Sequence, residues 1–553
     1  MKESTIYRRR ERLRKITGGL GLGDAYSVTI ERIKAQGGDR PRLGMEALMW
    51  ICYAERPLKA DELCHALAIE LGSPSFNADN VPSMSTLVGC CQGLITVDKE
   101  ASTVRLIHFT LQEYLSSSGD ISHSPHSVLA EICLTYLNSE PVKAIAADCF
   151  PGIPNMPFLK YCSLYWGVHA KRELSDHARS LALQLLQECD GHISIKYLFE
   201  EEGFWFRGVV GGMSLQFSGL HWASFFGVVE AVAALTEMGC YDTNASDFHG
   251  MTPIAWAARK GHEEIVRILL EQVEVSPNKP DSCKATPFFY AAENGHEGVA
   301  KVLLGRQEVN PDQPNYCGQT PFSCAAMYGH EGMVKMLIAR EDINPHRPDD
   351  TGNTPFTHAA HRGHKEVVNI LLAYQDIDPD KPHTWDSTLL WDAAAGGDEE
   401  AAKVLLRREE ADPDKADNYG KTLLSHAASN GHKGVVKILL GCKEVNPGKP
   451  DNFGKTPLSH AASWGHEEVV KILLSSQEVN PDKPNNDGRT PLWYAAFMGY
   501  KEVVKILLSR EEVNPDKPDN YGRTPLLGAA SVGREEVVKL LSYLDGKRSP
   551  PTS

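Results

Sequence analysis

The sequence predicts a mostly α-helical protein whose larger part is a solenoid of stacked repeats. A Thr-Pro or Thr-Leu pair followed by Ala-Ala recurs nine times at a spacing of 34 residues, and a degraded tenth copy begins near Ser218. A fixed period over most of a chain is typical of stacked repeats. Each copy is followed by an apolar stripe at helical spacing, which one unit cannot bury alone. The nine threonines are Thr252, Thr286, Thr320, Thr354, Thr388, Thr422, Thr456, Thr490 and Thr524.

The residues inside one well-preserved unit identify the kind of repeat. The run 451–462 reads Asp-Asn-Phe-Gly-Lys-Thr-Pro-Leu-Ser-His-Ala-Ala, and Gly465-His466 then opens a second helix containing Val-Val and Leu-Leu pairs. This pattern closely resembles the ankyrin consensus. Thr456 can cap the first helix, and the proline after it loses no hydrogen bond in the first turn. Gly465 supplies the tight turn between the two helices.

Two departures from the consensus carry their own predictions. The connector 478–486 is one residue longer than usual, which explains the 34-residue period, and Pro481 and Pro484 are expected to stiffen it. The copy at Thr388 has Asp386 in place of the turn glycine and Asp398 in place of the histidine. We expect the array to be locally distorted there.

Composition excludes several classes of protein. The 553 residues are 42% hydrophobic and 23% charged, and a formal net charge of −15 argues against a general nucleic-acid or acidic-membrane surface. Thirteen cysteines without paired spacing are read as reduced thiols of an intracellular protein, nuclear or cytoplasmic. The sequence shows neither an apolar membrane span nor a signal core.

The chain before the repeats is predicted to hold three segments. Residues 1–19 are basic, and the run 8–15 is interpreted either as a nuclear-localisation patch or as a solvated helix start. Residues 20–118 contain two predicted helices, 43–53 and 59–70, followed by a hairpin of 95–97 with 104–107, which suggests a winged helix. Residues 119–213 form a helical linker, 214–544 the ankyrin array and 545–553 a disordered tail.

The winged-helix segment carries a second resemblance. The run 106–115, Leu-Ile-His-Phe-Thr-Leu-Gln-Glu-Tyr-Leu, is similar to the region that follows the NACHT nucleotide-binding domain of fungal NOD-like receptors. The resemblance implies that His108 would contact the β-phosphate of bound ADP. This sequence contains no GxxxxGK[ST] loop, however, so we favour a packed, inert histidine at the end of a strand.

Catalytic, metal and cofactor sites are not indicated. The repeated Gly-His-Glu never becomes HExxH, and there is no Gly-x-Ser-x-Gly elbow. The recurrent histidines are expected to satisfy backbone groups at the start of each second helix. We therefore expect no enzyme, no metal and no cofactor.

Function is instead expected on two parts of the array. One is the tips of the loops that precede each first helix, which we call fingers, and the other is the exposed ends of the first helices. Aromatic, methionine and arginine side chains are enriched among interface anchors. The candidates are His249, Arg259, Lys260, Met327, Tyr328, His361, Arg362, Trp385, Tyr419, Phe453, Trp464, Phe497, Met498 and Tyr521.

The leading hypothesis is a non-enzymatic protein-binding regulator or scaffold, with a transcription factor as one possible partner. A truncated or split NOD-like-receptor signalling protein is the alternative. Direct DNA binding by the winged helix is a third hypothesis, which the acidic balance disfavours.

Overall fold

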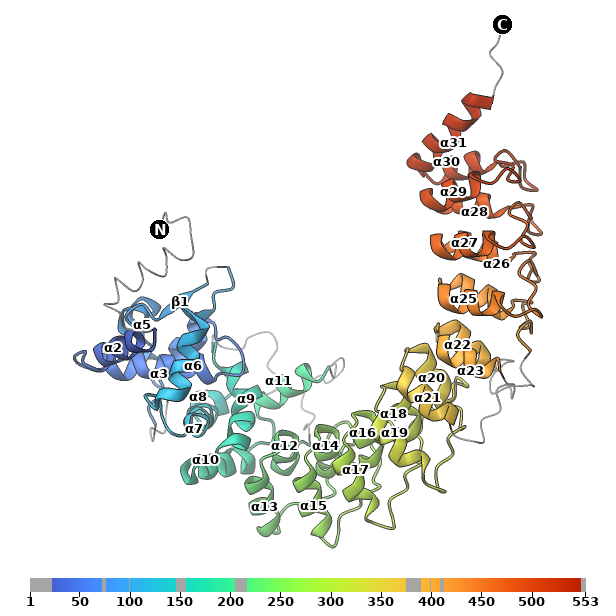
Figure 1. The fold of residues 1–553 in the computed structure, drawn as a ribbon. Coiled ribbons are helices and arrows are strands. Elements are labelled where there is room, and N and C mark those ends of the chain that lie inside the picture. The colour runs from blue at the N-terminus through green and yellow to red at the C-terminus, as the bar shows by residue number, and fades with distance from the viewer. Residues whose placement is uncertain are drawn as a thin grey trace, which may run out of the picture. The chain divides into compact units, whose positions relative to one another are not determined.

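The computed structural model describes residues 22–71, 76–98, 100–145, 156–203, 216–373, 389–397, 399–407 and 412–548. The described residues are mostly helical, with one two-stranded sheet. The chain divides into two compact units, Met1–Ser282 and Cys283–Ser553 (Figure 1). We call them unit 1 and unit 2.

Unit 1 begins with the predicted winged helix. The two strands pair antiparallel, with Ile95 opposite Leu106 and Val97 opposite Val104, which confirms the expected hairpin. Both predicted helices are present as α3 and α4. The elements are α2 (Leu22–Lys34), α3 (Arg40–Tyr53), α4 (Ala60–Leu67), η1 (Ala78–Asn80), α5 (Met84–Cys90), β1 (Ile95–Val97), β2 (Val104–Leu106) and α6 (Phe109–Ser118).

The helices that follow share a core with the winged helix. The Trp50 ring of α3 meets Phe158 and Tyr161 edge-on, with ring centroids 5.3 and 5.7 Å apart. All three rings are buried, so their apolar area holds the two segments together. These helices are α7 (Pro125–Leu137), α8 (Glu140–Lys143), α9 (Leu159–Arg172), α10 (Asp176–Gln187) and α11 (Ile193–Glu201).

Two repeats complete unit 1, and the first of them packs directly on the linker helices. A Cβ at Gly167 would lie 2.2 Å from the Phe226 ring, and one at Gly219 would lie 2.2 Å from the Leu186 carbonyl oxygen. Glycine is therefore required at both positions for this close approach. The repeat helices are α12 (Gly219–Phe226), α13 (Val229–Glu237), α14 (Pro253–Lys260) and α15 (Glu263–Glu271).

Unit 2 consists of ankyrin helix pairs stacked in chain order, with the connecting loops along one side (Figure 1). Its helices are α16 (Pro287–Glu293), α17 (Glu297–Leu304), α18 (Pro321–Met327), α19 (Glu331–Ile338), α20 (Pro355–His361), α21 (Lys365–Ala373), α22 (Leu389–Gly396), α23 (Glu399–Leu405), α24 (Leu423–Ser429), α25 (Lys433–Leu440), α26 (Pro457–Trp464), α27 (Glu467–Leu474), α28 (Pro491–Met498), α29 (Lys501–Leu508), α30 (Pro525–Ser531) and α31 (Glu535–Arg548).

The features expected inside the repeat are present. Thr456 Oγ1 accepts the Ser459 backbone N–H at 3.2 Å, and Gly465 adopts φ 77° at the turn. His466 Nε2 lies 2.9 Å from the Ser429 carbonyl oxygen of the preceding repeat. The recurrent histidines thus satisfy backbone groups, as predicted, and the structure adds that these groups belong to the preceding repeat. The same contact is made by His262, His330, His364 and His432.

The long connectors are joined by a ladder that the sequence did not reveal. Lys517 Nζ contacts both the backbone carbonyl and the carboxylate of Asp482, each at 2.9 Å. Lys483 Nζ donates to the Gly448 carbonyl at 3.1 Å, and Lys449 makes the same two contacts with Asp414. These three connector lysines therefore each bond to the connector one repeat earlier.

The copy at Thr388 forms a helix pair in spite of its sequence changes. Helix α22 packs between α20 and α24, so the stack continues through it. Thr388, Asp386 and Asp398, on which the predicted distortion rested, lie outside the described residues. At the C-terminal end α31 reaches Arg548, within the segment expected to be a disordered tail. All cysteines that the structure describes are free, and most are buried.

Candidate protein-binding surface

The finger loops of unit 2 present large aromatic rings to solvent. Tyr419, Phe453 and Tyr521 occupy equivalent positions of their repeats and are 64%, 58% and 70% exposed. The Phe453 backbone N–H donates to Asp451 Oδ1 at 3.0 Å, and its carbonyl accepts the Asn486 N–H at 3.0 Å. The loop thus uses the backbone of this residue and leaves its ring free for recognition. Tyr316, also exposed, is a further finger aromatic that the sequence analysis missed.

The first-helix ends supply a second group of exposed side chains. Tyr328, Trp464 and Met498 are exposed at these ends, and His361 and Arg362 are exposed in the repeat at Thr354. The Arg362 guanidinium lies 5.2 Å from the centre of the Tyr328 ring, within the range of a cation–π contact. These predicted residues are therefore available at the surface of unit 2.

An arginine–tryptophan cluster on α28 lies beneath this surface, with the Trp493 ring only 3% exposed. The Arg489 and Arg523 guanidinium groups lie 4.4 and 5.8 Å from the Trp493 ring centre, and Phe497 stacks on that ring at 5.0 Å. Each arginine immediately precedes the capping threonine of its repeat, and Trp493 stands at the third position after one. That pairing of positions is the signal that could have identified the cluster. Phe497 is consequently half-buried rather than fully exposed.

Two other predicted partner-binding residues are not part of the exposed surface that the structure describes. Met327 is 7% exposed because its side chain joins the buried face of α18, so it is removed from the candidate surface. Trp385 lies outside the described residues.

The three candidates in unit 1 are engaged by their own unit. Lys260 Nζ pairs with Glu202 at 2.5 Å, and Arg259 lies 3.8 Å from the same carboxylate. The His249 ring packs against Phe199 of α11, with centroids 5.4 Å apart. The end of α11 and Glu202 therefore occupy the surface on which a partner was expected. We restrict the candidate surface to unit 2.

Three finger aspartates form structural hydrogen bonds with histidines of the first helices. Asp451 Oδ1 accepts two backbone N–H groups, from Phe453 and Lys455, and Oδ2 lies 2.9 Å from His460 Nε2. Burial lowers the pKa of His460 to about 4, so the ring is neutral at physiological pH and its N–H can donate to the carboxylate. His460 therefore stabilises the finger through its hydrogen bond to Asp451 and does not face a ligand.

His108 is an exposed helix cap rather than a packed side chain. It follows β2 as expected, but its Nδ1 accepts the Thr110 backbone N–H at 3.3 Å at the start of α6. The packed interpretation was wrong because the capping geometry directs the ring outward. His108 lines a pocket of about 370 Å³ together with Arg56 and Arg105. Arg56 is already held by Glu62 through two 2.7 Å bonds.

The comparisons agree with this architecture. The model for ankyrin repeats (3 copies) matches residues 220–315, 288–383, 390–485 and 476–548, which together exceed half of the chain. The chain therefore belongs to the ankyrin-repeat family. The model for the winged helix domain of GPI inositol-deacylase matches residues 32–125, which confirms the predicted winged helix.

One curated relative shares part of the sequence. The azaphilone pigments biosynthesis cluster protein L of Monascus ruber is 28% identical over 140 residues, or 22% of this chain. The chain covers 29% of the length of that relative.

The findings support a coarse functional class. Ankyrin arrays present recognition surfaces for protein partners, so the repeats support a protein-interaction scaffold. Among the helices of the described residues, none has the length and apolar character needed to cross a membrane. The relation to NACHT proteins remains a prediction.

Proposed function

We propose that the protein is a non-enzymatic regulator that binds a protein partner through the finger loops and first-helix ends of unit 2. The observation that carries this proposal is the row of exposed rings at equivalent repeat positions, Tyr419, Phe453 and Tyr521. The loop at Phe453 uses the backbone of this residue, and the Tyr521 ring lies 5.0 Å from the Arg523 guanidinium while remaining 70% exposed. Large exposed apolar groups held on a rigid backbone are costly to leave in water and are suited to recognition.

The chemistry of the surface indicates the kind of partner. An exposed aromatic ring lies near an exposed guanidinium group at Tyr328 and Arg362, so the partner should offer apolar side chains together with carboxylates or backbone carbonyls. Because the rings belong to repeats that stack on one another, the partner segment must be long enough to span several repeats.

The test is capture of partners by proximity labelling with the full chain. We expect the triple variant Tyr419→Ala, Phe453→Ala and Tyr521→Ala to lose the partners that the wild type labels, because about 1 kcal/mol or more per buried anchor is lost. The control is Tyr543→Ala, which removes an exposed ring of α31 outside the finger positions. Identical partner sets for the wild type and the triple variant would refute this surface.

A transcription factor is the partner class that we test first. The basic run 8–15 supports this version by its composition and lies outside the described residues. Deleting residues 1–15 should abolish nuclear accumulation of a fluorescent fusion. An unchanged nuclear signal would remove the sequence basis of the nuclear version.

A truncated or split NOD-like-receptor signalling protein is the second candidate. The winged-helix match and the pocket at His108, Arg56 and Arg105 favour it. It predicts that this chain binds ADP or ATP by itself, measurable by equilibrium dialysis and weakened by His108→Ala. We rank it second because both arginines already face acids, Arg56 at Glu62 and Arg105 at Asp98. Salt-sensitive binding of duplex DNA would instead support the winged helix as a DNA-binding module.

A further inference from the structure

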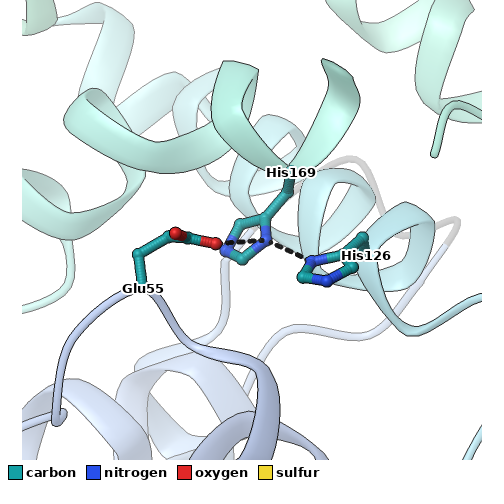
Figure 2. Close-up of side chains that lie close together, drawn as sticks. All are labelled: Glu55, His126 and His169. Atoms are coloured by element: carbon teal, nitrogen blue, oxygen red, sulfur yellow. Dashed lines mark hydrogen bonds and ion pairs between the residues drawn. The ribbon is translucent and has the colours of Figure 1, made fainter. Parts of the chain in front are cut away.

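Three metal-ligand side chains converge where the winged helix meets the linker helices of unit 1. Glu55 follows the end of α3, His126 lies in the first turn of α7, and His169 lies in α9 (Figure 2). One ligand atom from each lies within 4.8 Å of the other two. The two Nδ1 atoms are 2.9 Å apart, and His169 Nδ1 is 3.8 Å from Glu55 Oε1.

We propose that Glu55, His126 and His169 bind a zinc ion. In a tetrahedral zinc site with bonds of about 2.0 to 2.1 Å, neighbouring ligand atoms lie about 3.4 Å apart. The separations of 2.9 and 3.8 Å in the structure lie on either side of this value, so small side-chain movements suffice to admit the ion. Two imidazoles and one carboxylate form a donor set that zinc favours and that leaves a fourth position for water.

The surroundings prepare His169 as a ligand. Its ring is fully buried. Its Nε2 lies 2.9 Å from the Tyr161 hydroxyl, which also accepts the Glu55 backbone N–H at 3.0 Å. A hydrogen bond from Nε2–H to Tyr161 leaves the Nδ1 lone pair directed away from the tyrosine, and such outer partners orient metal-bound histidines.

Arg172 competes with the metal for the same ligands. Its guanidinium bonds to both Glu55 oxygens and lies 3.4 Å from His126 Nε2. The Arg172 side chain is 48% exposed, so it can turn to solvent when a divalent cation takes its place. Glu55 also lines the pocket of about 370 Å³ on the winged helix.

The proposed ion would join three segments that are distant in sequence. It would connect the end of α3 with α7 and α9, in addition to the buried contacts of Trp50. Zinc should therefore raise the midpoint of thermal unfolding of the full chain, because a ligand that binds only the folded state stabilises it.

The test is titration of the chelator-treated full chain with ZnCl₂ in competition with a chromophoric chelator. Exposed thiols also bind zinc, so the background variant carries Cys240→Ser, Cys283→Ser and Cys317→Ser. In this background we expect one zinc per chain, accompanied by a rise in the thermal midpoint. Glu55→Gln and His126→Ala should each weaken binding by at least tenfold.

Two further variants separate a zinc site from general effects. Arg172→Met removes the competing cation and should tighten zinc binding, whereas a purely structural hydrogen-bond network would only be weakened by it. His177→Ala is the matched control, since His177 lies near Glu131 in the same region at 3.3 Å and should not affect binding. If His126→Ala fails to fold by circular dichroism, Glu55→Gln and Arg172→Met decide. No zinc uptake by the background variant, or equal affinity in Glu55→Gln, would overturn the proposal.

Discussion

At the residue scale, a threonine hydroxyl oxygen caps eight first helices in the described part of the array. Thr456 Oγ1 accepts the Ser459 backbone N–H in a position that is almost inaccessible to water. Thr456→Ala leaves that N–H without a partner and should cost about 1 kcal/mol of stability, whereas Thr456→Ser keeps the acceptor and should cost much less. Guanidinium unfolding of unit 2, followed by circular dichroism, measures both. Equal losses for the two variants would show that the lost methyl group, and not the cap, matters.

A buried histidine gives unit 1 a defined response to acid. His221 is fully buried, its Nε2 facing the carbonyls of Ala245 and Met251, and burial lowers its pKa to about 4. Between pH 6.5 and 4 the unfolded state binds a proton that the folded state does not, so the stability due to this group is complete above pH 6.5 and falls as the pH falls. Asp247, whose pKa burial raises to about 6, acts in the opposite direction because its folded form gains the proton first.

The size of the loss of stability in acid that His221 causes can be measured with one variant. For His221 the two pKa values imply a loss of about 2 kcal/mol on going from pH 7.5 to pH 5. His221→Gln should reduce the pH dependence of the guanidinium midpoint of unit 1 by that amount while lowering the midpoint at pH 7.5. A variant with the wild-type pH dependence would show that another group controls the acid response.

At the element scale, the connectors depend on lysines that reach the preceding repeat. Lys517 Nζ bonds to the carbonyl and carboxylate of Asp482, whose side chain is largely buried. Lys517→Met removes both bonds and should cost about 1 to 2 kcal/mol, after allowance for the partial exposure of the lysine. Lys505→Met, which breaks an exposed pair with Glu502 on α29, is the control and should cost less than about 0.5 kcal/mol. Similar losses in the two variants would contradict a structural role for the ladder.

The elements that the sequence predicted are those specified by local patterns. The Thr-Pro start, the glycine turn and the apolar stripe lie within one repeat, and the hairpin of β1 and β2 is joined by a short loop. The features that the sequence analysis missed depend on contacts between segments that are distant in sequence. The engagement of Lys260 by Glu202, and the convergence of Glu55 with His126 and His169, require knowledge of how α7, α9 and α11 fold against the rest of unit 1.

At the scale of the whole molecule, a repeat array is held together by contacts between nearest neighbours. Stability is then distributed along the stack, and a repeat with a smaller core becomes the place where the stack opens first. In the repeat of α22 and α23, Ala401 and Ala402 stand where α27 has Val469 and Val470. All four side chains are buried, so this repeat contributes less apolar area than the one at Thr456.

The last prediction follows from this weak repeat. Hydrogen exchange should be faster at the α22 and α23 amides than at those of α26 and α27, because each missing buried CH₂ lowers the local opening free energy by about 0.8 kcal/mol. Mass-spectrometric exchange of the full chain measures this difference. Ala401→Val with Ala402→Val should slow exchange in α22 and α23 and in the adjoining α20 and α24, while leaving α28 and α29 unchanged. A uniform change along unit 2 would instead mean that the repeats unfold as one cooperative block, and equal exchange rates in the wild type would show that the alanine pair is fully compensated by closer packing.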